Sequence, residues 1–310
     1  MVLATITSAF FLSIISSHYC QKYFLKKKLV DKINVRSSHD SVATRSGGLS
    51  VFLVLIIISI YYYLNGIDIF NFSIFIPLSL LFLIGVYDDI YGVDFKLKFI
   101  FQIIAAKIII DNGLIIDNFH GFLGVYEVNR VIAQLITIFI IISIINAINF
   151  IDGIDGLLTS ISIIFITSYE FFASVNTDFY FLSLLVISTL IPLYYFNFRK
   201  AKKIFLGDAG SYLLGGIISI YVLNILSFQY RIKPEFDLNK IIFVISILIY
   251  PIIDIIRIFS LRLINKKSPF VADNNHIHHN ILNYNNSHFK TTFLICCFTI
   301  FAIICIQLLF

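Results

Sequence analysis

The sequence predicts an all-α fold: a polytopic membrane helical bundle of about ten transmembrane helices, in a single integral-membrane domain over residues 1–310. Composition is the first indication, because 59% of the residues are hydrophobic and only 13% are charged, whereas a soluble domain is about 25% charged. Length is the second, because ten apolar stretches each approach the roughly 20 residues that a helix needs to cross a bilayer. A lipid bilayer is the expected environment, and no nucleic-acid partner is expected.

The ten predicted spans follow one another along the whole chain. They lie near residues 2–20, 48–65, 69–87, 99–116, 131–148, 157–174, 179–196, 209–228, 241–260 and 291–310. The first is expected to be an uncleaved span, because no Lys or Arg precedes it and no convincing small-residue cleavage site follows it.

The charges of the connecting segments predict the orientation. Segments after odd-numbered spans, with the residues just beside them, carry 18 Lys and Arg residues, and the opposite side carries four. Positive loops favour the cytoplasmic side. We therefore expect both termini on the periplasmic or extracellular side of the inner (cytoplasmic) membrane.

Four polar clusters share the predicted cytoplasmic side. They are DDIYGVD at 88–94, IDGIDG at 151–156, GDAGS at 207–211 and HIHH at 276–279. One active site assembled from four loops is the simplest interpretation. The alternative is coincidence, because all basic loops must lie on that side.

Carboxylates dominate the first two clusters. Asp88 and Asp89 are adjacent, so their repulsion raises a pKa or recruits a cation; the alternative is a solvated helix end, although acids are unfavourable there. Asp152 and Asp155 are each followed by a glycine, and Gly153 would let a ligand approach the backbone closely. A polar turn between spans is the alternative for this loop, to which Asn149 adds an amide.

Asp208 opens the eighth predicted span. It can be a simple helix cap, or it can hold Mg²⁺ together with phosphate oxygens, where small residues let a diphosphate reach the helix N-terminus. Lys98, at the start of the fourth span, can neutralise a phosphate or only serve the charge bias of the loops. Asp254 and Arg257, at i and i+3 of the ninth span, are expected to form an internal ion pair.

Histidines and arginines complete the set of candidates. His276, His278 and His279 favour contact with phosphate or sugar over zinc, because no Cys or clear fourth ligand accompanies them; an ordinary polar loop is the alternative. Arg36 and His39 lie in a basic loop that can also serve topology or lipid headgroups. Together these residues suit metal-assisted phosphoryl transfer between an embedded lipid and a soluble substrate.

The ordered motifs resemble the polyprenyl-phosphate N-acetylhexosamine-1-phosphate transferase family over nearly the whole chain. They are RSSH…SGG at 36–48, DD at 88–89 with Lys98 downstream, NAINFIDGIDGL at 146–157, GDAGS at 207–211 and SPF…D..HIHH at 268–279. The resemblance implies that a UDP-N-acetylhexosamine and undecaprenyl phosphate give undecaprenyl-diphospho-N-acetylhexosamine and UMP. It also implies an Mg²⁺ cofactor, with Mn²⁺ as the alternative metal; a homodimer stays an open alternative to the monomer.

The resemblance implies roles for individual residues. Asp208 and Asn149 would form the metal and diphosphate site, and Asp88, with Asp89 beside it, would deprotonate or position the lipid phosphate. Lys98 would contact phosphate. The remaining candidates would bind substrate: Asp152, Gly153 and Asp155 at the nucleotide end, with His276, His278, His279, Arg36 and His39. Direct attack by the lipid phosphate is favoured over a covalent aspartyl intermediate.

The branch of the family is suggested by HIHH, in which Ile277 interrupts the three consecutive histidines of the muramoyl-pentapeptide branch. This favours UDP-GlcNAc and the start of O-antigen (lipopolysaccharide), teichoic acid or a related cell-surface polysaccharide. UDP-FucNAc and UDP-QuiNAc are alternative donors, because RSSH resembles O-antigen initiators, some of which use these sugars; UDP-MurNAc-pentapeptide is a further alternative. SVATRSGG lacks the family's prolines and Asn274 replaces a common basic residue, and both departures bear on the sugar more than on the reaction type. More distant alternatives are an intramembrane prenyltransferase, which would want a second DxxxD-like cluster, and a transporter.

Overall fold

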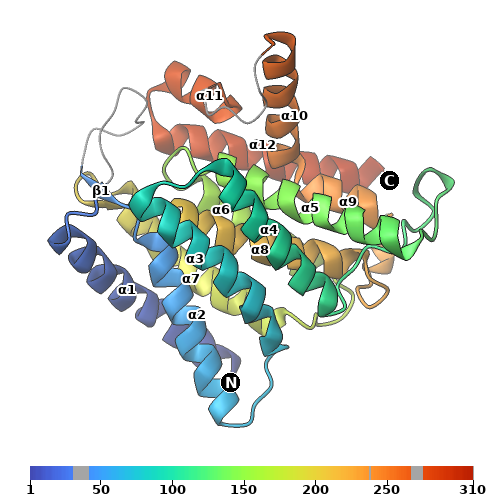
Figure 1. The fold of residues 1–310 in the computed structure, drawn as a ribbon, viewed down its shortest axis with the longest axis horizontal. Coiled ribbons are helices and arrows are strands. Elements are labelled where there is room, and N and C mark those ends of the chain that lie inside the picture. The colour runs from blue at the N-terminus through green and yellow to red at the C-terminus, as the bar shows by residue number, and fades with distance from the viewer. Residues whose placement is uncertain (31–41, 237–238, 267–274, 310) are drawn as a thin grey trace.

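The computed structural model describes residues 1–30, 42–236, 239–266 and 275–309, which form a helical bundle with one two-stranded parallel sheet (Figure 1). The elements are α1 (Val2–Lys26), β1 (Ala43–Thr44), α2 (Gly47–Leu64), α3 (Phe75–Tyr91), α4 (Phe95–Asp111), α5 (Arg130–Phe150), α6 (Leu157–Phe172), α7 (Tyr180–Phe198), β2 (Lys203–Ile204), α8 (Gly207–Leu226), α9 (Lys240–Ile247), α10 (Ile249–Ile264), α11 (Ile277–Asn285) and α12 (His288–Leu309). Short 3-10 turns lie at Phe72–Ile74, Phe122–Gly124 and Pro234–Phe236. The predicted all-α polytopic bundle is confirmed.

Helix α8 is the core of the bundle. Every residue of α8 except Asp208 is buried, as expected for a helix that is apolar on all sides. It packs against α2, α3, α5, α6 and α9, and it lies in the middle of the molecule in Figure 1. The start of this central helix is therefore held from several directions.

The predicted spans all contain helices, but the helices differ in length. Within the described residues, seven helices are long and apolar enough to cross a membrane, or eight if α9 and α10 form one bent span. Helices α4 and α6 have 17 and 16 residues and are shorter than the predicted spans. The predicted span 241–260 is wrong as one straight helix, because α9 and α10 meet at a 76° bend. Pro251 explains the bend: it donates no N–H, and its ring clashes with the carbonyl of Ile247, where α9 ends.

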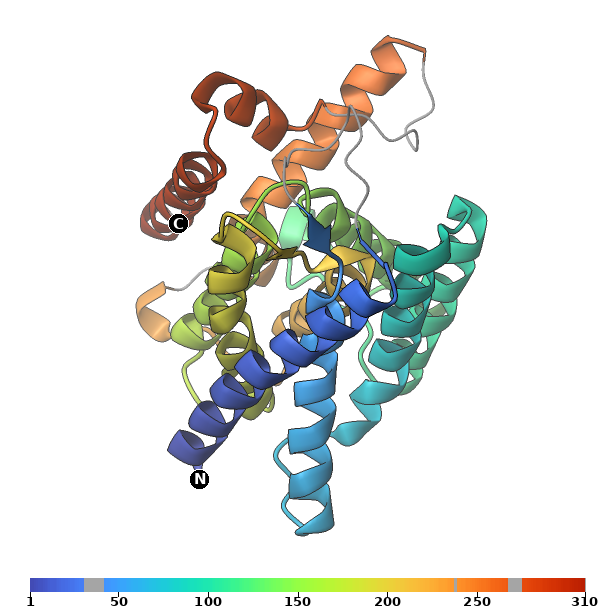
Figure 2. The same ribbon diagram turned by 90° about the vertical axis from the view of Figure 1, so that its left-hand side faces the viewer.

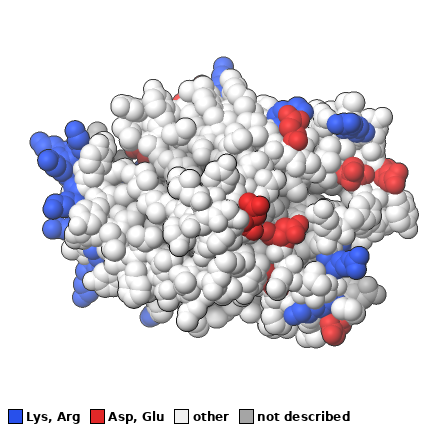
Figure 3. Space-filling view, turned by 90° about the horizontal axis from the view of Figure 1, so that it is seen from below, with Lys and Arg blue, Asp and Glu red and all other residues white. Residues whose placement is uncertain are grey.

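Charge is distributed unevenly over the surface. Figure 3 shows Lys and Arg gathered at one end with few visible acidic side chains, a broad area nearly free of charges, and acidic and basic side chains mixed toward the other end. The basic end is the end at which β1 lies in Figure 1. The area nearly free of charges has the character of a lipid-facing surface. Figure 2 shows the same bundle from its left-hand side, with α1 running across the face of the other helices.

Glycines bring α2, α3 and α8 into close contact at the basic end. A Cβ on Gly48 of α2 would lie 2.2 Å from the backbone N of Gly210, and a Cβ on Gly85 of α3 would lie 2.5 Å from the carbonyl O of Asp208. Small residues permit such close backbone packing of membrane helices. Strands β1 and β2 pair just before α2 and α8, and the Gly47 N–H donates to the carbonyl of Phe205 at 2.9 Å. The last turn of α3 is thereby placed against the first turn of α8.

Candidate active site

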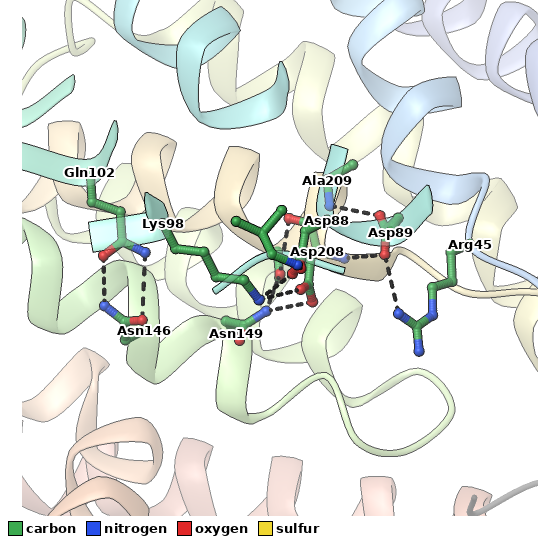
Figure 4. A network of polar contacts seen from close by, with 11 residues as sticks. Arg45, Asp88, Asp89, Lys98, Gln102, Asn146, Asn149, Asp208 and Ala209 are labelled. Atoms are coloured by element: carbon green, nitrogen blue, oxygen red, sulfur yellow. Dashed lines mark hydrogen bonds and ion pairs between the residues drawn. The ribbon is translucent and has the colours of Figure 1, made fainter. Parts of the chain in front are cut away.

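Four residues predicted from separate motifs meet at the start of α8 (Figure 4). Lys98 of α4 donates to Oδ2 of Asp208 at 3.3 Å and also pairs with Asp88 of α3. Asn149 of α5 donates to Oδ1 of Asp208 at 2.9 Å. Asp88, Lys98, Asn149 and Asp208 thus form one cluster, as the common-site interpretation requires.

Each member of the cluster is held by its own element. Asp88 is 8% exposed, and its Oδ1 accepts the N–H of Val93 at 2.7 Å, just after α3 ends. Helix α4 is tied to α5 by the Gln102–Asn146 pair, in which the Asn146 amide donates to Oε1 of Gln102 at 2.9 Å. The carboxylate of Asp208 is 25% exposed, so a ligand can reach it.

Asp89 has a different position from Asp88. Its Oδ1 accepts the N–H of Asp208 and its Oδ2 accepts the N–H of Ala209, both at 3.0 Å. Arg45 lies on the other side, with Nη1 3.6 Å from Oδ1. The expectation that a diphosphate approaches the N-terminus of α8 is not met at these two amides, because Asp89 already occupies them.

The loop 151–156 carries Asp152 and Asp155, which differ in environment. Burial, together with the negative charges of Asp208 and Asp89, raises the pKa of Asp152 well above its ordinary value. Arg45 and the hydrogen bond from the Gly207 N–H lower this pKa, but by less. Asp155 is 4% exposed and pairs with Lys203 of β2. The carbonyl of Asp155 also accepts a hydrogen bond from Thr292 of α12 at 2.8 Å. Asp155 therefore joins the loop to β2 and α12, while Asp152 faces the acidic cluster.

The first histidine, His276, is oriented by Asp254 of α10. Its Nδ1 lies 2.6 Å from Oδ2 of Asp254, and the N–H of Ile277 donates to Oδ1 at 2.8 Å. The predicted Asp254–Arg257 ion pair is wrong, because Arg257 donates instead to the carbonyl of Asn275 at 2.6 Å. The start of α11, which packs on α12, thus presents a histidine and its first backbone N–H to the buried carboxylate of α10.

The second histidine, His278, is packed against the loop 151–156. It is fully buried, its Nδ1 lies 3.0 Å from the hydroxyl of Tyr250, and its Nε2 has no hydrogen-bond partner among the described residues. A Cβ on Gly153 would lie 2.5 Å from that Nε2. Gly153 therefore makes room for a histidine of the chain, where the sequence suggested room for a ligand. The ring of His279 lies beside it, with ring centroids 4.3 Å apart and the planes tilted by 43°.

Some predicted residues were not placed, and some contributing residues were not predicted. Arg36 and His39 lie outside the described residues. Lys203, which pairs with Asp155, was counted only as a loop charge, and nothing in the sequence distinguishes it from its basic neighbours. Asp254 had a signal, because a carboxylate inside an apolar helix needs a buried partner.

The acidic cluster has the chemistry of a site for a hard cation. Four carboxylates (Asp88, Asp89, Asp152 and Asp208) face two cationic side chains (Lys98 and Arg45), which leaves an excess of negative charge. Within the described part of the chain, no three His, Cys, Asp or Glu side chains are arranged to hold a metal by themselves. Mg²⁺ needs only one or two carboxylates when substrate phosphates supply other ligands. The donor set therefore fits a metal that arrives with a diphosphate.

An apolar cavity of about 280 Å³ lies between α5, α8, α9 and α10. Its walls include Ala147 and Ile148, the residues just before Asn149, together with Val222 of α8 and Pro251 at the helix break. Ser143 is the one polar side chain in its lining. A hydrocarbon chain fits such walls, and the cluster around Asn149 lies next along α5.

Comparison with known proteins agrees with these features. The profile of the family described as glycosyl transferase family 4 matches residues 70–226. A Bacillus subtilis protein, named as a probable undecaprenyl-phosphate N-acetylglucosaminyl 1-phosphate transferase, is 31% identical over 270 residues, covering 85% of this chain and 72% of its own length. A Haemophilus influenzae undecaprenyl-phosphate alpha-N-acetylglucosaminyl 1-phosphate transferase is 35% identical over 265 residues, covering 81% and 71%.

A mycobacterial relative extends the similarity. The decaprenyl-phosphate N-acetylglucosaminephosphotransferase of Mycolicibacterium smegmatis is 29% identical over 235 residues, covering 70% of this chain and 58% of its own length. The family profile covers all the acidic motifs at the start of α8, from Asp88 to Asp208. This chain belongs to glycosyl transferase family 4.

Proposed function

We propose that the protein transfers N-acetylglucosamine-1-phosphate from UDP-N-acetylglucosamine to undecaprenyl phosphate and releases UMP. The names of the relatives support the lipid acceptor and the transferred N-acetylglucosamine-1-phosphate, and one structural observation supports this site as the place of the reaction. Lys98 lies between the carboxylates of Asp88 and Asp208, and Asn149, which donates to Asp208, directly follows Ile148 in the wall of an apolar cavity. A phosphate-binding cation and a hydrocarbon-binding cavity are what a lipid phosphate needs.

The reaction can be written with these residues. An oxygen of the lipid phosphate attacks the sugar-bearing phosphorus, and the bond from that phosphorus to the bridging oxygen breaks, so that UMP leaves with this oxygen. Asp88 either takes the remaining proton of the lipid phosphate or only holds its attacking oxygen in line. Lys98 stabilises the charge that develops on the phosphoryl oxygens.

The metal part of the proposal concerns Asp208 and Asn149. The carboxylate of Asp208 is 25% exposed, and Asn149 donates to its Oδ1 at 2.9 Å. These two residues would hold Mg²⁺, or Mn²⁺, which when bound neutralises the diphosphate of the sugar nucleotide. Asp152, His276 and His279 would border the nucleotide and sugar.

The orientation of the site follows from the charge of the basic end. Nucleotide sugars are cytoplasmic, and positive loops favour that side. We place the cluster at the cytoplasmic face of the inner membrane, with the isoprenoid in the cavity between α5, α8, α9 and α10. The product would begin a lipid-linked cell-surface polysaccharide such as an O-antigen.

A panel of radiolabelled UDP-sugars tests the proposal. Purified protein is incubated with undecaprenyl phosphate, Mg²⁺ and one donor at a time: UDP-GlcNAc, UDP-FucNAc, UDP-QuiNAc or UDP-MurNAc-pentapeptide. We expect UMP and a lipid-linked diphospho-sugar in equal amounts with UDP-GlcNAc, and none with Asp208→Asn. Turnover with another donor alone would correct the sugar, and no UMP with any donor would overturn the reaction.

A further inference from the structure

Asp89 accepts hydrogen bonds from the backbone of α8, whereas its neighbour Asp88 faces Lys98. The Asp89 side chain is 1% exposed. Each of its oxygens accepts a backbone N–H from the first turn of α8, from Asp208 and from Ala209, at 3.0 Å. The first N–H groups of a helix have no partner inside the helix, so a carboxylate from α3 satisfies them here.

The packing around Asp89 is shaped for this contact. Gly207 has φ +69, and a Cβ there would lie 2.6 and 2.8 Å from the two Asp89 carboxylate oxygens. Gly85, one turn before Asp89 on α3, lets the two backbones approach, because a Cβ there would meet the carbonyl of Asp208 at 2.5 Å. Any larger residue at either position would separate Asp89 from α8.

Electrostatics favours the same arrangement. The partial positive charge at a helix N-terminus attracts a carboxylate, and Arg45 adds a full positive charge 3.6 Å from Oδ1 of Asp89. Both interactions hold Asp89 in place against the nearby negative charges. The amides of Asp208 and Ala209 are consequently not available to a substrate phosphate.

We infer that Asp89 is a positioning residue, which caps α8 from α3 and so fixes the backbone that carries Asp208. It acts through Asp208 and does not itself touch the lipid phosphate or the metal. The two residues of the DD motif then have different roles: Asp88 faces the reacting groups, and Asp89 holds the start of α8. The kinetic consequence rests on the proposed function, whereas the structural consequence does not.

Amide hydrogen exchange in the first turn of α8 tests the capping directly. In Asp89→Asn, one charge-assisted hydrogen bond is lost, so exchange at Asp208 and Ala209 should accelerate by roughly ten- to a hundredfold. Asp88→Asn, which changes the same chemistry one residue earlier, should leave this exchange unchanged. Unchanged exchange in a folded Asp89→Asn protein would overturn the inference.

A pair of glycine variants provides an independent test. Gly207→Ala should displace the Asp89 carboxylate and accelerate the same amides. Gly66→Ala is the matched control, because Gly66 has nearly the same φ, +68, but no atom lies within 4 Å of its added Cβ. Both variants meet the same backbone strain. Equal effects of the two at the start of α8, or none from Gly207→Ala, would contradict the capping.

Kinetics separates positioning from direct catalysis. With UDP-GlcNAc, undecaprenyl phosphate and Mg²⁺, Asp89→Asn should raise the Mg²⁺ concentration needed for half-maximal rate, and excess Mg²⁺ should restore part of the rate. Asp88→Asn should lower kcat without such a shift. A loss in Asp89→Asn that Mg²⁺ does not restore would make Asp89 a catalytic residue. If the wild-type protein makes no UMP, the proposed function fails, while the exchange experiment still decides the capping.

Discussion

The Nζ of Lys98 on α4 lies 3.3 Å from Oδ2 of Asp208 on α8. The same ammonium group pairs with Asp88 on α3, so one cation holds carboxylates from two other helices together. Without it, the two negative charges would repel at close range. Lys98 therefore both assembles the cluster and offers the positive charge that a phosphate would use.

Replacing Lys98 with Gln should lower kcat by about 10² to 10³, the range found when one donor to a developing negative charge is removed. The control is Lys96→Gln, because Lys96 is exposed on the same turn of α4. Initial rates of UMP release at saturating substrates measure both. Similar losses in the two variants would mean that Lys98 contributes only general surface charge.

Asp208→Asn should abolish turnover at ordinary Mg²⁺ concentrations while the protein stays assembled. An Asn keeps the shape of the side chain but removes the charge that a hard cation requires. Assembly is checked by size-exclusion chromatography, and metal use by rates measured over a Mg²⁺ series. A normal Mg²⁺ dependence with full rate would remove Asp208 from the metal site.

The sequence predicts the main cluster because each motif is a short local stretch, and because the Lys and Arg residues of the loops predict that all of these motifs face the cytoplasmic side of the membrane. Asp88, Lys98, Asn149 and Asp208 each stand at one end of an apolar run on the predicted cytoplasmic side, and the structure brings their side chains together. Pro251 also carried a readable signal, since a proline inside a long helix predicts the break that divides α9 from α10.

Residue partners across helices were harder to predict. Spacing of three residues suggested Arg257 for Asp254, but its partner is His276, which stands 22 residues later at the start of α11. Asp89 was grouped with Asp88 because the two are adjacent, yet successive residues on a helix point in different directions. Only the packing of α3 against α8 decides which of the two faces the reacting groups.

Asp254→Asn should weaken the binding of UDP-GlcNAc, because Asp254 orients His276. An Asn can still accept the Ile277 N–H, but it no longer fixes the proton on Nδ1 of His276 and loses a bond to a charged group worth about 1.5–3 kcal/mol. We expect KM for UDP-GlcNAc to rise about tenfold. Ser260→Ala is the control, because Ser260 is exposed on the same helix, and an equal rise in that variant would argue against a role of the Asp254–His276 pair.

Ala147→Phe should fill the apolar cavity and raise KM for undecaprenyl phosphate, while KM for UDP-GlcNAc stays unchanged. Ala147 is buried and lines the cavity, so a ring there competes with a hydrocarbon chain. Leu135→Phe is the control on the same helix, because Leu135 is 64% exposed. If Ala147→Phe leaves lipid KM unchanged but the protein remains folded, the isoprenoid lies elsewhere.

His278 should make the protein less stable as the pH falls. Burial, together with His279 and His276, keeps the pKa of folded His278 well below 6.5, while in the unfolded chain it is about 6.5. The unfolded state therefore binds the proton first, and stability is full above pH 6.5 and falls below it, by up to about 1.4 kcal/mol per pH unit until the folded pKa is reached. His278→Gln should flatten this part of the dependence of the melting temperature between pH 5 and 8, because it removes the titrating group. His18→Gln is the control, since His18 is exposed on α1, and parallel curves for the wild type and His278→Gln would show that other groups cause the loss.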